Sequence, residues 1–81
     1  MSEADKMFKE LGYKLVEHKP YYCFFYKKLE EDCQEEEMYH IEFNYESKTV
    51  NKSYGDDQTV ANITMQELQA INMKCRELKW I

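Results

Sequence analysis

The 81-residue chain has two glycines and one proline, and it contains no apolar run of the roughly 20 residues that a membrane-spanning helix needs. Its N-terminus, Met-Ser-Glu-Ala-Asp-Lys, lacks the basic start and apolar stretch of a secretion signal. With so few glycines, no glycine-rich turn is available to build an oxyanion hole. We therefore expect a cytoplasmic protein with no membrane segment and no enzymatic activity.

Cysteine and histidine are also scarce. Cys23, Cys33 and Cys75 are odd in number and widely spaced, unlike the cysteines of a secreted disulfide framework. Together with His18 and His40 they include no closely spaced pair of the Cys-x-x-Cys kind, so we predict neither a metal site nor a cofactor. The spacing favours Cys23 and Cys75 as small core residues rather than as catalytic groups.

The net charge is −5, and six carboxylates lie in residues 30–37 around Cys33 and Gln34. An acidic chain opposes simple nucleic-acid binding, because neutralising phosphates requires clusters of Lys or Arg. The acidic stretch lacks the alternating ligands and the glycine of an EF-hand, so we interpret it as a solvated loop. Acidic mimicry of DNA remains an alternative reading of the same stretch.

The strongest fold signal is aromatic, since ten of the twelve aromatic residues lie between Tyr13 and Tyr54. A strand is predicted over 21–29, and it is apolar on both faces: Tyr22, Phe24 and Tyr26 on one, Tyr21, Cys23 and Phe25 on the other. Strands without a polar face are normally covered on both sides. The segment 38–45 alternates apolar and polar residues, which is typical of a half-buried strand.

Both ends of the chain have helical patterns. Ser2 resembles a helix cap and Gly12 a helix stop, which predicts a helix over 3–11. Thr64 and Glu67 form a capping-box pattern, which predicts a second helix over 65–78. Its apolar stripe consists of Met65, Leu68, Ile71, Cys75 and Leu78.

The order of elements predicts an α+β fold in one domain, 1–81. An antiparallel meander of three or four strands (13–17, 21–29, 38–45 and 49–54) is flanked by an N-terminal and a C-terminal helix, with 56–63 as a loop. Both helices can cover one face of the sheet, or one helix can lie on each face.

Three segments, Met7–Tyr13, Ile63–Asn72 and Glu77–Trp80, resemble a group of small proteins encoded by phages and prophages of Gram-positive bacteria. The resemblance runs the length of the chain and consists of helix and turn patterns rather than catalytic motifs. Members usually have glycine in a Leu-Gly-Trp-like ending, where this chain has Lys79. The group has no established activity, so the resemblance implies a phage-like protein and assigns no functional residue.

The doubly apolar strand supplies the functional hypothesis. If both helices cover one face, the other exposes Tyr and Phe side chains in a patch, as protein interfaces do. We therefore expect a protein-binding module that contacts a second copy or another protein. The candidate contact residues are Tyr21, Tyr22, Cys23, Phe24, Phe25 and Tyr26. The alternative is a nucleic-acid-related role, by base stacking on the rings or by acidic mimicry, and few basic residues accompany the rings.

Overall fold

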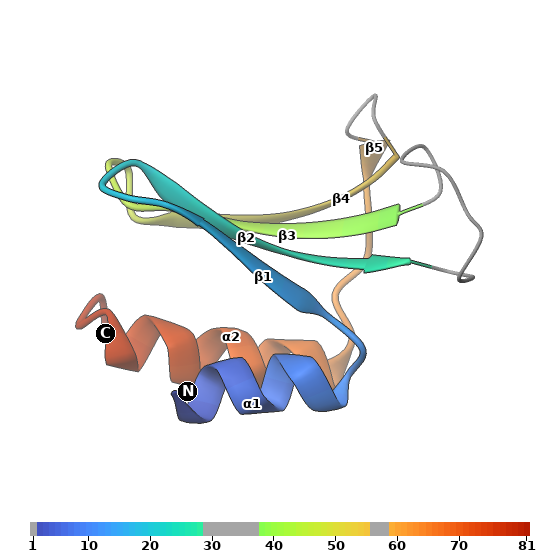
Figure 1. Cartoon of the computed structure of the whole chain (residues 1–81), viewed down its shortest axis with the longest axis horizontal. Coiled ribbons are helices and arrows are strands. Elements are labelled where there is room, and N and C mark those ends of the chain that lie inside the picture. The colour runs from blue at the N-terminus through green and yellow to red at the C-terminus, as the bar shows by residue number, and fades with distance from the viewer. Residues whose placement is uncertain (1, 29–37, 56–58) are drawn as a thin grey trace.

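The computed structural model describes residues 2–28, 38–55 and 59–81 and has the predicted α+β architecture (Figure 1). Its elements are α1 (Glu3–Glu10), β1 (Lys14–His18), β2 (Tyr22–Lys28), β3 (Met38–Asn44), β4 (Thr49–Tyr54), β5 (Thr59–Val60) and α2 (Met65–Glu77). The strands form one antiparallel sheet in the order β1-β2-β3-β4-β5. Figure 1 shows both helices side by side against the same face of the sheet, so the fold has two layers.

Two details of the strand prediction are corrected. β2 begins at Tyr22, and Tyr21 lies in the preceding turn, where it is 66% exposed. The segment 56–63, predicted as a loop, contains the short strand β5. Both residues of β5 are exposed, so this strand lacks the alternation of buried and exposed residues by which a half-buried strand is predicted. The predicted acidic loop 30–37, with Cys33, lies outside the described residues.

Helix α1 begins and ends as its sequence predicts. The Ser2 hydroxyl accepts a hydrogen bond from the Asp5 amide at 3.0 Å, which satisfies one of the amides exposed at the helix start. At the other end Gly12 adopts a φ of +94°, and the Tyr13 amide donates to the Phe8 carbonyl at 2.9 Å. This is a Schellman turn, in which glycine is favoured because a side chain strains a positive φ.

The two ends of helix α2 are stabilised in the same way, by a side-chain cap at the start and a turn with positive φ at the end. The Thr64 hydroxyl accepts from the Glu67 amide at 3.1 Å and the Glu67 carboxylate accepts from the Thr64 amide at 3.0 Å, which confirms the capping box. At the end of α2 the Trp80 amide donates to the Cys75 carbonyl at 2.9 Å, and Lys79 has a φ of +61°. Lys79 therefore occupies the left-handed position that Gly12 occupies after α1.

The core lies between the helices and the sheet and is built mainly from aromatic rings. Phe8 of α1 stacks on Phe25 of β2, with ring centroids 3.9 Å apart, and meets Phe43 of β3 edge to face. Trp80 folds back from the end of α2 to within 6.2 Å of the Phe43 ring. Large rings bury much apolar area for few residues, which suits a domain of this size.

The buried face of α2 differs from the stripe that the sequence predicts. Ile71 is buried, but Met65 at the start of the stripe is 71% exposed. The structure instead buries Glu67 and Lys74 beside Ala70. The sequence pattern assigns charged residues to solvent, whereas these two are buried because each has a charged partner elsewhere in the chain.

None of the helices described is both long and apolar enough to cross a membrane.

Candidate functional site

Strand β2 divides the candidate contact residues between two environments. Cys23 and Phe25 point toward the helices and are 0% and 1% exposed, so they belong to the core. Their inclusion among the surface residues is corrected, because α1 and α2 cover this side of the sheet. Tyr22, Phe24 and Tyr26 point to the opposite side and are half-buried. We call this side of β1–β4 the outer face, and these three residues the aromatic stripe.

The aromatic stripe is continuous along β2. The Tyr22 and Phe24 rings stack with centroids 6.2 Å apart, and the Phe24 and Tyr26 centroids lie 6.3 Å apart. On the neighbouring strand β3, His40 lies beside Tyr26 in the register and meets the Phe24 ring at 5.8 Å. The outer face thus carries a line of contacting rings that neither helix covers (Figure 1).

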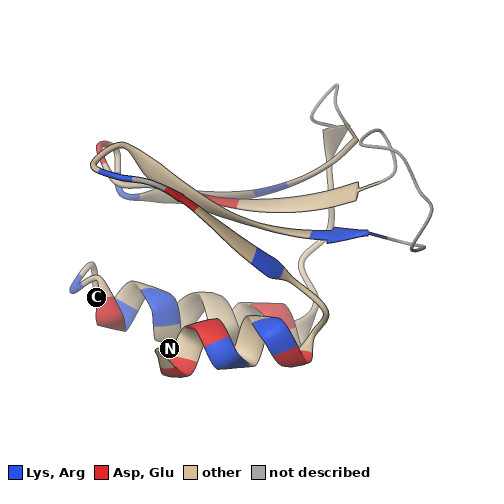
Figure 2. Cartoon of the chain, in the orientation of Figure 1, with Lys and Arg blue, Asp and Glu red and all other residues tan. Residues whose placement is uncertain are grey.

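Two lysines flank one end of the stripe. Lys14 of β1 pairs with Tyr26, and Lys28 follows Tyr26 on the same side of β2. Figure 2 shows these positive positions at the start of β1 and the end of β2. Glu42, which pairs with Phe24, is the one carboxylate that the described strands place on the outer face. The outer face is therefore not acidic, although the chain as a whole is.

The sign of the charge differs between the described residues and the rest. All 11 Lys and Arg lie in the described ranges, but only eight of the 16 Asp and Glu do, because the other eight fall in residues 30–37 and 56–57. The described residues therefore carry a formal net charge of +3, against −5 for the whole chain. The net charge of the chain does not predict the charge of a particular surface.

A buried polar network ties the sheet to the start of α2. The Tyr13 hydroxyl donates to Glu67 Oε2 at 2.6 Å, and Lys52 Nζ donates to Glu67 Oε1 at 2.8 Å. Lys52 Nζ also donates to the Asn62 carbonyl at 2.8 Å, and it lies 4.6 Å from the centre of the Tyr39 ring. The Lys52 and Glu67 side chains are 6% and 7% exposed. Sequence reasoning identified Glu67 only as a capping residue.

This network affects two pKa values. Burial opposes ionisation of Glu67, but hydrogen bonds from Lys52, Tyr13 and the Thr64 amide outweigh it and lower the pKa of this carboxylate. Burial and the hydrogen bond to Glu67 raise the pKa of Tyr13. Every buried side-chain N or O atom within the described ranges has a hydrogen-bond partner. We therefore interpret the network as a set of stabilising contacts between the sheet and α2 rather than as a reactive site.

The described thiols do not form a reactive centre. Burial raises the pKa of Cys23, and its hydrogen bond with Tyr45 offsets only part of this increase. Burial also raises the pKa of Cys75. Cys23 and Cys75 lie on the helix side of the sheet, whereas His40 lies on the outer face, so His40 pairs with neither of these described cysteines. These residues contain no cluster of His, Cys, Asp and Glu suited to a metal ion.

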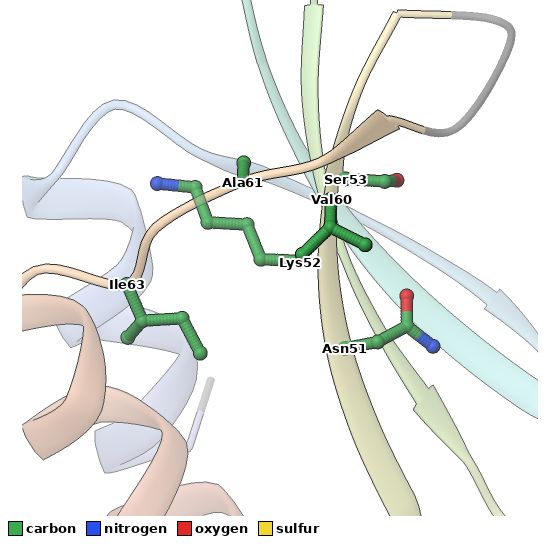
Figure 3. Close-up of a pocket in the computed structure, with 6 residues that line it drawn as sticks. All are labelled: Asn51, Lys52, Ser53, Val60, Ala61 and Ile63. Atoms are coloured by element: carbon green, nitrogen blue, oxygen red, sulfur yellow. The ribbon is translucent and has the colours of Figure 1, made fainter.

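An open hollow of about 440 Å³ lies beside β4 and β5 (Figure 3). Its lining residues are Asn51, Lys52, Ser53, Val60, Ala61 and Ile63. The Lys52 side chain extends beneath Ala61, and its amine is already bonded to Asn62 and Glu67. Figure 3 shows the Asn51 and Ser53 side chains on the opposite side of β4 from the Lys52 side chain, so these polar groups do not converge as they do in a small-molecule site.

Comparisons with protein-family models, with curated proteins and with solved structures give no match to this chain.

Proposed function

We propose that this chain is a non-enzymatic, phage-like protein-binding module whose contact surface is the outer face. The observation that carries the proposal is that both helices lie on one side of a sheet whose strand β2, paired on both edges, is aromatic on both sides. The helices bury Cys23 and Phe25 and leave Tyr22, Phe24 and Tyr26 on the other side.

The composition of the outer face supports a protein partner. Interface centres are enriched in aromatic residues and surrounded by polar residues that hydrogen-bond at the rim. Here the aromatic stripe lies over β2, and Asn44 and Asn51 extend from β3 and β4 on the same side. Rings already held by their neighbours lose little conformational freedom on binding, which favours association.

The test compares a triple variant with a matched control. Changing Tyr22, Phe24 and Tyr26 to Thr removes the rings but keeps residues that favour strands. Tyr21→Thr makes the same kind of change at an exposed turn position outside the stripe. We expect fluorescently labelled wild type and Tyr21→Thr to sediment in complexes, either in extract of the native host or as the purified chain at up to about 1 mM, and the triple variant to sediment alone in both.

Equal sedimentation of the triple variant and Tyr21→Thr, both in extract and as purified chains at up to about 1 mM, would contradict the proposal. Near-ultraviolet circular dichroism reports on the Phe43–Trp80 packing and confirms that each variant is folded. If the triple variant does not fold, Tyr26→Thr alone replaces it, because Tyr26 lies at the end of the stripe and its loss disturbs the fewest ring contacts.

A second candidate is binding of single-stranded nucleic acid, favoured by the rings spaced 6.2 and 6.3 Å apart and by Lys14 and Lys28 beside them. A labelled oligonucleotide tests it by fluorescence anisotropy at low salt. Binding that the triple variant loses and that salt weakens supports this function. Anisotropy that does not change excludes it.

A further inference from the structure

We propose that the partner of the outer face is a second copy of this chain, bound face to face around a twofold axis. This inference rests on the proposed function, since it takes the outer face as the contact surface. Its basis is the charge pattern around the aromatic stripe. A lysine of β1 lies beside Tyr26 on one edge of β2, and a carboxylate of β3 lies beside Phe24 on the other edge.

The register fixes these four positions. Lys14 of β1 pairs with Tyr26 of β2, and Glu42 of β3 pairs with Phe24 of β2. Neighbouring strands lie roughly 4.8 Å apart and residues rise roughly 3.4 Å along a strand, so Lys14 and Glu42 are about 12 Å apart. The line that joins them crosses β2 midway between Tyr26 and Phe24. Lys14 is exposed and Glu42 is half-buried.

Consider a twofold axis that lies above the point midway between Tyr26 and Phe24, parallel to the outer face and perpendicular to the line from Lys14 to Glu42. Rotation about this axis places each of these two charged residues over the other one in the second copy. Lys14 of each copy then lies opposite Glu42 of the other, and every contact occurs twice, as symmetry requires. The Tyr26 and Phe24 rings of both copies lie between the two ion pairs. The outer face is thus self-complementary in charge as well as apolar at its centre.

The charge of the outer face is also compatible with self-association. Two copies with a net charge of −5 repel each other, and contact between like charges is costly. Among the described strands, the outer face carries Lys14 and Lys28 and one carboxylate, Glu42, so these residues of the two copies meet without opposing negative charges. Four strands of five to seven residues give a face of roughly 19 Å by 17–24 Å, so we expect a weak dimer, with a Kd of about 10–100 µM.

The experiment is sedimentation equilibrium of the purified chain from about 1 µM to about 1 mM, a range that spans such a Kd. We expect the wild-type mass to rise from one copy to two. Lys14→Glu and Glu42→Lys each place like charges at both contacts, so each raises the Kd about tenfold or more. The double variant exchanges the two charges and restores the Kd to within about threefold.

Lys6→Glu is the control, since it makes the same change of charge at an exposed position of α1, on the other side of the molecule. We expect it to change the Kd less than about twofold. The inference is overturned if the wild type stays monomeric up to about 1 mM, if both single reversals leave the Kd unchanged, or if the double variant fails to recover.

The outcomes also separate this inference from the proposed function. If the wild type is monomeric but the triple threonine variant still loses its complexes in extract, the outer face binds a different protein and only the second copy is wrong. If the triple variant dimerises as the wild type does and also keeps its complexes in extract, both the inference and the proposed function fail.

Discussion

Replacing Glu67 with Gln tests the account of the buried network. Gln has the same shape, and its carbonyl oxygen can still accept from Lys52 Nζ and the Thr64 amide while its NH₂ group donates to the Tyr13 hydroxyl. The charge is what the substitution removes. Lys52 keeps the Asn62 carbonyl and the Tyr39 ring as partners, but its ammonium loses its buried counter-ion.

The expected loss of stability follows from this geometry. Removing one partner of a buried ion pair costs about 3–5 kcal/mol when nothing replaces it. Because Gln preserves the hydrogen bonds, we expect Glu67→Gln to lower the free energy of unfolding by about 2–3 kcal/mol. A domain of this length then melts about 10–20 °C lower. That is a large part of the total stability of a small domain.

The assay is chemical denaturation followed by Trp80 fluorescence, with Glu17→Gln as the control. Glu17 pairs with Lys19 at 3.7 Å on the surface, and the Lys19 side chain is 76% exposed. The same chemical change there should cost less than about 0.5 kcal/mol. If Glu67→Gln also lies within about 0.5 kcal/mol of wild type, the reasoning about the network is refuted.

The pH dependence of the same pair of proteins supplies a second measurement. The folded pKa of Glu67 lies below its ordinary value of 4.5, so its stabilising contribution is complete above pH 4.5 and is lost as the pH falls through the lower, folded value. The stability gap between wild type and Glu67→Gln should therefore narrow as the pH falls below 4.5. A gap that stays constant down to acid unfolding would count against the ion pair.

Two further predictions concern the helix ends and the tyrosines. Gly12 and Lys79 both have positive φ, a conformation that glycine adopts without strain. Lys79→Gly should therefore raise the free energy of unfolding by about 0.5–1 kcal/mol, and Gly12→Ala should lower it by about 1 kcal/mol. Equal effects of the two substitutions on the free energy of unfolding would contradict this. Burial and hydrogen bonding raise the pKa of Tyr13 and Tyr45, so their contribution to stability is present below their ordinary pKa of 10.0 and lost as the pH rises above it. In an ultraviolet titration, Tyr13→Phe should therefore remove a late-ionising group, and an unchanged late phase would exclude Tyr13 as its source.

Local sequence patterns predicted most of the fold because their causes are local. The capping box at Thr64 and the stop at Gly12 depend on residues a few positions apart. The burial of Glu67 could not be predicted in this way, since its partners Tyr13 and Lys52 lie 54 and 15 residues away. An apolar periodicity assigns such a charge to solvent, so the predicted stripe on α2 included Met65 and omitted Glu67.

The sequence predicted that the candidate contact surface includes one face of β2, but it did not predict which of the two faces. Alternation along β2 separates Cys23 and Phe25 from Tyr22, Phe24 and Tyr26, but both sets are apolar. Which set the helices cover depends on how the meander folds over them, and no residue of β2 encodes it locally. Both helices lie on one face of the sheet (Figure 1), and the burial of Cys23 and Phe25 identifies that face as theirs.

The most direct measurement of the central claim is a map of amide chemical-shift changes in the isotopically labelled chain as it passes from the free to the complexed state. The account predicts changes at Lys14, Tyr22–Tyr26, His40 and Glu42, with α1 and α2 unchanged. Shifts concentrated on the helices, or around the hollow beside β5, would contradict the assignment of the outer face as the contact surface.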